Sequence, residues 1–148
     1  MYVKNGDTPI IVSIRNGQKN TFIKLIENGA DINVKDKYGK SLLLIAFENW
    51  QDDIVKLLLD HYSNPNQVDQ NGTGIIFHYF ENVKYDIVKY FIEHGANINK
   101  KNKEGNTLLM LSCIRGNYDI MKYLINHGAD MNQENNNGDT PLIMFQRI

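Results

Sequence analysis

The sequence contains a single cysteine, Cys113, so no intrachain disulfide bond can form. Structural disulfides are typical of oxidising compartments, and their exclusion favours a reducing location inside a cell. We therefore expect the protein in the cytoplasm, or in the cytoplasm of a host cell if it is a secreted effector.

Long apolar segments are also lacking. The longest uninterrupted run, Leu42 to Phe47, has six residues, whereas a membrane-spanning helix needs about 20. Basic residues are not in excess either, because 16 Lys and Arg oppose 17 Asp and Glu to give a net charge of −1. Nucleic acid and anionic membranes are normally bound through such an excess. The composition thus predicts neither a nucleic-acid partner nor a membrane partner.

What the sequence does contain is an internal repeat. Its 148 residues, 42% of them hydrophobic and 22% charged, fit one globular domain over residues 1–148. Glycine recurs every 33 residues without an insertion, and apolar residues follow each glycine at fixed distances. The glycines of this series are Gly6, Gly39, Gly72, Gly105 and Gly138. The units are predicted at about residues 3–35, 36–68, 69–101 and 102–134, with a partial unit at 135–148.

Each unit is predicted to form two short helices. Thr or Ser follows most repeat glycines by two residues and is a good N-cap, so first helices are predicted at about 8–15, 41–48, 75–81, 107–114 and 140–147. The second helices are predicted to begin near Asn20, Asp53, Asp86 and Asp119, which either cap the helix or, as aspartate, meet its positive dipole end. Short helices are marginal alone, so the copies are expected to stack into a solenoid.

The residues that end and begin the units carry a family resemblance. The stretches Asn126-His-Gly-Ala-Asp-Met-Asn and Asn137-Gly-Asp-Thr-Pro-Leu, with the 33-residue period, resemble the ankyrin repeat over the whole chain. A tetratricopeptide array would instead have a 34-residue period and a different aromatic pattern. The resemblance implies an all-α ankyrin-repeat solenoid of about 4.5 helix–turn–helix repeats joined by hairpin-like loops. It also implies a protein–protein interaction module that binds its partner on the concave surface and performs no catalysis.

Some positions depart from the ankyrin pattern. Trp50 and Val83 stand where the family has the glycine that ends the first helix. Valine is poorly suited to a positive φ, so Asn49 and Asn82, one residue earlier, are predicted to adopt the left-handed conformation instead. Tyr62 likewise replaces the glycine that ends a second helix.

Large aromatic side chains gather in the second and third units. They are Trp50, Phe77, His78, Tyr79 and Phe80. Two interpretations remain open: sequence drift, in which large residues fill one another's gaps, or a central contact region, since aromatic residues are enriched in binding hot spots. Tyr79 and Phe80 fall within the apolar stripe of the first helix, which favours the core for these two.

The sequence predicts no catalytic residue, metal or cofactor. His61, His94 and His127 lie 33 residues apart, but neighbouring repeats are separated by about 10 Å, whereas zinc needs donors at about 2 Å from one centre. A histidine in the last helical turn is better explained by the negative end of the helix dipole. Cys113 lies in a mostly apolar helical segment and is predicted to be a buried side chain.

The resemblance implies partner-binding residues beside the repeat glycines and in the last turn of each first helix. They are Tyr38, Lys40, Glu48, Asn71, Thr73, His78, Glu81, Lys103, Asn106, Ile114 and Arg115. Mixed charge favours a protein partner, and Tyr38, Ile114 and Arg115 are the expected anchors. The alternative is an accessory or truncated part of a larger protein that scaffolds or inhibits an enzyme supplied elsewhere. The apolar last helix leaves open a monomer or weak self-association.

Overall fold

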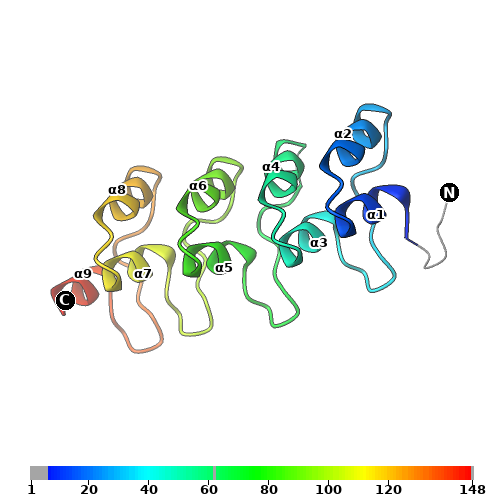
Figure 1. The fold of residues 1–148 in the computed structure, drawn as a ribbon. Coiled ribbons are helices and arrows are strands. Elements are labelled where there is room, and N and C mark those ends of the chain that lie inside the picture. The colour runs from blue at the N-terminus through cyan, green and yellow to red at the C-terminus, as the bar shows by residue number, and fades with distance from the viewer. Residues whose placement is uncertain (1–6, 62, 148) are drawn as a thin grey trace. The chain divides into compact units, whose positions relative to one another are not determined.

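A computed structural model describes residues 7–61 and 63–147. Within these ranges the chain forms nine α-helices and no strand beyond isolated bridges (Figure 1). They are α1 (Pro9–Arg15), α2 (Lys19–Glu27), α3 (Leu42–Glu48), α4 (Asp52–Asp60), α5 (Ile75–Glu81), α6 (Tyr85–Glu93), α7 (Leu108–Ile114), α8 (Tyr118–Asn126) and α9 (Pro141–Gln146). The predicted all-α repeat fold is confirmed.

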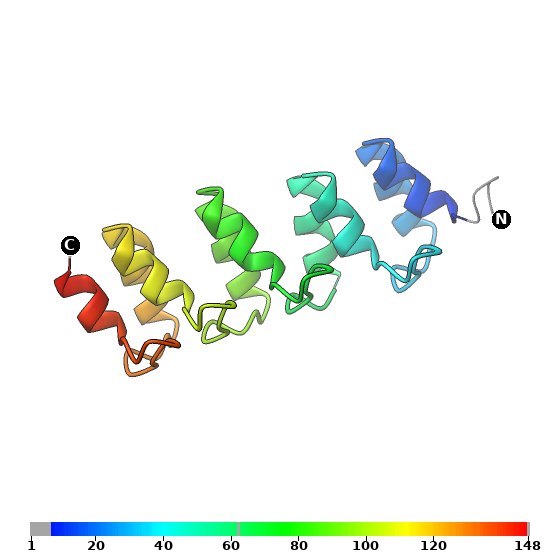
Figure 2. The ribbon, with the colours of Figure 1, turned by 90° about the horizontal axis from the view of Figure 1, so that it is seen from below.

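The chain divides into two compact units, each with its own core. Unit 1, Met1–Gln67, holds α1 to α4, and unit 2, Val68–Ile148, holds α5 to α9. Within each repeat the two helices lie antiparallel, and the loop that follows projects away from them (Figure 1, Figure 2). In unit 1, α1 packs on α2 and α3, and α3 packs on α4; in unit 2, α7 packs on both α8 and α9.

The first helices begin where the sequence predicts. The side chains of Ser41, Thr107 and Thr140 each accept a hydrogen bond from the backbone N–H three residues on, at 3.2, 3.3 and 3.4 Å. Thr8 takes the N-cap position of α1 without such a bond, and Gly74 has no side chain to offer. A capping side chain satisfies one of the free N–H groups of the first turn.

The second helices begin one residue earlier than predicted. The expected capping role of Asn20 is wrong, because this residue lies inside the first turn of α2 and the N-cap is Gln18. Asp53, Asp86 and Asp119 also lie in the first turn, where their carboxylates meet the positive end of the helix dipole, as the second alternative proposed.

The turns between paired helices overturn another prediction. Asn49 and Asn82 have negative φ values of −96° and −86°, whereas Trp50 and Val83 take positive values of 54° and 61°. The reason is the hydrogen-bond pattern that ends the first helix. In α3 the N–H of Trp50 donates to the carbonyl of Phe47 at 2.9 Å, and the next N–H donates to the carbonyl of Ala46 at 3.0 Å. This pair of hydrogen bonds requires a left-handed residue at that position, whatever its side chain. Tyr62 lies outside the described residues.

Most of the aromatic side chains of the third repeat form the core of unit 2. Phe77, Tyr79 and Phe80 are each 0% exposed, and the ring of Tyr79 lies 5.6 Å from that of Phe91. Burial of such a side chain contributes roughly 1.5–3 kcal/mol to stability. These three residues are therefore not part of a contact region, and only Trp50, at 46% exposure, and the half-buried His78 remain at the surface of their own units.

The apolar last helix is only partly covered. Met144 packs with Met110 and Cys113 in one buried cluster, which also confirms the predicted burial of the thiol. Leu142 remains 62% exposed, and Ile143 and Phe145 are each 37% exposed. In the part of the chain that the structure describes, no helix is both long and apolar enough to span a membrane.

Candidate functional site

Within the described residues, each of the four hairpin-like loops is folded by one Asx side chain that the sequence reasoning missed. Asp36, Asp69, Asn102 and Asn135 lie three residues before the repeat glycines. In every copy one side-chain oxygen accepts the backbone N–H groups two and four residues on, at 2.8–3.1 Å. The signal was present as a column of Asp and Asn with the 33-residue period. This bond pair fixes the backbone that carries the predicted binding residues.

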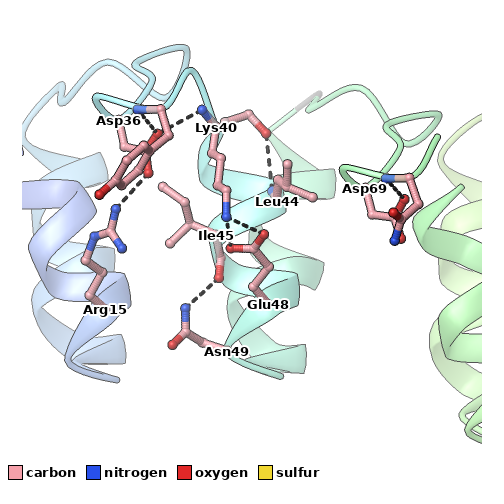
Figure 3. Close-up of polar contacts among 11 residues, drawn as sticks. Arg15, Asp36, Lys40, Leu44, Ile45, Glu48, Asn49 and Asp69 are labelled. Atoms are coloured by element: carbon pink, nitrogen blue, oxygen red, sulfur yellow. Dashed lines mark hydrogen bonds and ion pairs between the residues drawn. The ribbon is translucent and has the colours of Figure 1, made fainter. Parts of the chain in front are cut away.

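In unit 1, ion pairs order the hairpin and the adjacent helix ends (Figure 3). Arg15 at the end of α1 donates to the buried carboxylate of Asp36 at 2.7 Å and also pairs with Asp7 at 3.0 Å. Lys40 extends along α3 and pairs with Glu48 at 2.6 Å. Two of the predicted binding residues, Lys40 and Glu48, are therefore partners of each other.

Tyr38 projects from the hairpin tip of unit 1. Its side chain is 70% exposed, although its backbone is held by Asp36. The ammonium of Lys37 lies 5.1 Å from the centre of its ring, and these two residues with Asp7 and Arg15 line a pocket of about 150 Å³. An exposed aromatic ring on an ordered backbone can contact a partner at a small cost in conformational entropy.

In unit 2, the first hairpin is closed by a carboxylate–imidazole contact. Nε2 of His78 lies 2.9 Å from a carboxylate oxygen of Asp69, whose other oxygen accepts from Asn71 and Thr73. Burial alone would raise the pKa of Asp69, but the two N–H donors and His78 together hold that pKa below its usual value. The predicted residues Asn71, Thr73 and His78 thus surround one ordered carboxylate.

The remaining predicted residues of unit 2 differ in whether their side chains make contacts within the protein. Arg115 donates to the carbonyl of Phe80 at 2.8 Å and lies over the ring of that residue at 5.0 Å, so it holds neighbouring repeats together. The side-chain carbonyl of Asn106 accepts from Asn135 at 3.0 Å. Glu81 and Lys103 are exposed, and Ile114 is 50% exposed.

The histidine column has a structural explanation. In His61, His94 and His127, Nδ1 lies 2.7–2.8 Å from the carbonyl oxygen four residues earlier, at the end of the helix. The rings of the latter two also stack on Tyr90 and Tyr123, with centroids 4.4 and 3.9 Å apart. Among the described residues, no cluster of three or more His, Cys, Asp or Glu side chains could hold a metal ion. Burial raises the pKa of the Cys113 thiol, which suits an inert core side chain.

Comparison with known proteins agrees with the repeat geometry. A family model described as ankyrin repeats (3 copies) matches residues 1–69 and again residues 76–145. No curated protein sequence matches the chain. The two matched segments cover nearly all of the sequence, and the loop that follows Asp69 lies in the short gap between them. The chain therefore belongs to the ankyrin-repeat family, whose arrays are generally protein–protein interaction modules and are typically not catalytic.

Proposed function

We propose that this protein is a non-catalytic binding module that contacts a protein partner through its hairpins and the ends of its first helices. The observation that carries the proposal is the exposure of large apolar side chains on ordered backbone at these positions. Tyr38 is 70% exposed in unit 1, and Ile114 is 50% exposed in unit 2. Aromatic and aliphatic anchors surrounded by polar groups are typical of protein interfaces.

A second candidate is an accessory chain that docks on a larger assembly through the last helices of unit 2. It rests on the apolar groove of about 350 Å³ that α8 presents, lined mainly by Tyr118, Met121 and Ile125. Near this groove, the ring of Phe145 on α9 lies 6.1 Å from that of Tyr118. The same surface would support weak self-association.

The test is affinity capture from a native cell lysate with three baits. Tyr38→Ala and Ile114→Ala are combined in one variant, and Arg115 is left intact because its guanidinium bridges two repeats. Tyr118→Ala is the matched control, because this tyrosine is 67% exposed, almost as much as Tyr38. Circular dichroism first establishes that each bait is folded.

We expect a protein that the wild type and Tyr118→Ala retain and that the double variant loses. Loss with Tyr118→Ala alone would support docking through the last helices instead. Equal retention by all three baits would contradict both surfaces. Sedimentation analysis of the wild type and of a Leu142→Glu variant tests self-association. If the last helix mediates it, the wild type forms a dimer and the variant, which places a charge at this 62% exposed position, stays monomeric.

A further inference from the structure

An ion pair between the hairpin and the end of the first helix recurs in the repeats. The residue after the repeat glycine pairs with the residue eight positions on: Asp7 with Arg15 at 3.0 Å, Lys40 with Glu48 at 2.6 Å, and Asp139 with Arg147 at 2.9 Å. The order of charges is reversed in the second repeat. Because the pair survives this reversal, its role is to close the surface locally rather than to present one sign of charge.

In unit 2 this pair is missing from the third and fourth repeats. Thr73 stands opposite Glu81, and Asn106 stands opposite Ile114. Among the described residues, the Glu81 side chain makes no hydrogen bond or ion pair, and it is exposed. Ile114 presents an apolar side chain that is 50% exposed at the equivalent place.

The two open positions are neighbours. Arg115, next to Ile114, donates to the carbonyl of Phe80, next to Glu81, at 2.8 Å. The ends of α5 and α7 are therefore in contact, and equivalent residues of packed helices lie about 10 Å apart. Arg115 is held by this carbonyl and by the Phe80 ring, so its guanidinium is committed to Phe80.

We infer that the partner inserts a basic and an apolar side chain at this place, the cation against Glu81 and the apolar group against Ile114. The inference rests on the proposed function and adds the chemistry of the partner. About three residues of extended chain span about 10 Å, so the partner carries Lys or Arg about three residues from a large apolar residue. A carboxylate with no internal cation gains a charge-assisted bond on binding, whereas Glu48 would first have to give up Lys40.

The probe is a random peptide library displayed on phage and selected on the immobilised full chain. We expect enriched peptides that carry Lys or Arg about three residues from Leu, Ile or Phe. With one such peptide, Glu81→Gln and Ile114→Ala should each weaken binding about tenfold, the usual size of a lost contact to a charged group or of a truncated anchor. Glu27→Gln, at an exposed glutamate that ends the second helix α2, is the matched control and should leave affinity unchanged.

Exchange of the charges between Glu81 and the peptide tests the inference most directly. Glu81→Lys should abolish binding of the selected peptide. The same variant should bind a peptide in which the basic residue is replaced by Glu. Failure to enrich any peptide, a consensus without a basic residue, or full binding by Glu81→Gln would overturn the inference. If Tyr38→Ala loses the peptide while Glu81→Gln and Ile114→Ala bind normally, the inference is wrong and the binding-module function stands.

Discussion

The hairpins of unit 1 and unit 2 share one backbone template but are held differently. In unit 1 the hairpin is tied to helix ends by ion pairs, and nothing would lie within 4 Å of a Cβ at Gly39. In unit 2 the last two hairpins interlock through contacts to the main chain, and the backbone N–H of Asn136 donates to the carbonyl of Glu104 at 3.2 Å. Lys101 donates to the carbonyl of Glu134 at 2.8 Å, and a Cβ at Gly105 would lie 2.6 Å from the backbone nitrogen of Asn136. Ion pairs thus stabilise the hairpin of unit 1, whereas the Asn102 hairpin of unit 2 has no such pair among the described residues and is stabilised by close approach to the backbone of the next hairpin.

The largest expected effect separates these two glycines. Gly39 and Gly105 have almost the same φ, 77° and 78°. Alanine at either position pays the cost of a left-handed conformation, about 1 kcal/mol. At Gly105 the clash with Asn136 adds overpacking, so we expect a total loss of about 3 kcal/mol there. Urea unfolding followed by circular dichroism measures both losses, and equal losses would contradict the interlocked hairpins.

The next effect concerns the strained turns. Val83→Gly should stabilise the protein by about 1 kcal/mol, because glycine removes left-handed strain and Val83 is 64% exposed. Trp50→Gly in unit 1 should gain less, since it also loses the ring contact to Phe47 at 5.6 Å. Val83→Ala is the control, because alanine keeps a Cβ and most of the strain. A Val83→Gly protein no more stable than the alanine variant would contradict this assignment of strain.

These turns show what the sequence could and could not predict. Helix positions followed from the apolar period and from the caps, because both are local signals that recur in every repeat. Side-chain preference alone predicts the left-handed conformation at Asn49 and Asn82, and this prediction is wrong. In the structure the hydrogen bonds that end the helix decide it, and they place the positive φ on Trp50 and Val83.

A pH effect distinguishes two carboxylates. A hydrogen bond from Lys19 in unit 1 and its charge lower the pKa of Asp53, whereas in unit 2 backbone N–H donors and His78 outweigh burial at Asp69. A lowered pKa adds stability above the ordinary value of 3.8, which is lost as the pH falls through the folded-state value. NMR titration should show that about 1 M salt raises the pKa of the exposed Asp53 and leaves that of Asp69 lowered.

Replacement of the second carboxylate isolates its contribution. Asp69→Asn should keep the hairpin, because Asn102 and Asn135 accept the same two N–H bonds with an amide oxygen. The variant should lose less stability than the wild type when the pH falls below 3.8. An unchanged acid dependence would show that Asp69 is not the titrating group.

The smallest effect is the ion pair itself. Lys40 and Glu48 are 32% and 38% exposed, so Glu48→Gln should cost no more than about 0.5 kcal/mol, and less at high salt. Glu81→Gln should leave the free energy of unfolding unchanged, since no internal contact is removed from the described residues. If Glu81→Gln lowered the free energy of unfolding as much as Glu48→Gln, Glu81 would also have an internal partner. That result would contradict the difference between the two units and the inferred binding place.

The candidate site was predictable only as a set of positions. The family pattern yields a prediction of which residues face a partner, but it does not tell which of them already have internal partners. Lys40 and Glu48 neutralise each other, and Arg115 holds Phe80, because their side chains reach across eight or more residues of chain. Such pairings depend on three-dimensional distances, so they emerge only when the repeats are packed.

Because Cys113 is buried, the rate at which its thiol reacts can report local opening of the protein. Cys113 is 2% exposed and packs in one cluster with Met110 of α7 and Met144 of α9, and burial raises the pKa of its thiol. A thiol reagent can therefore react only after these helices separate. The rate of labelling under native conditions therefore measures how often the last repeats open, and no reactive group has to be introduced. A bound partner that holds these helices together would lower the labelling rate.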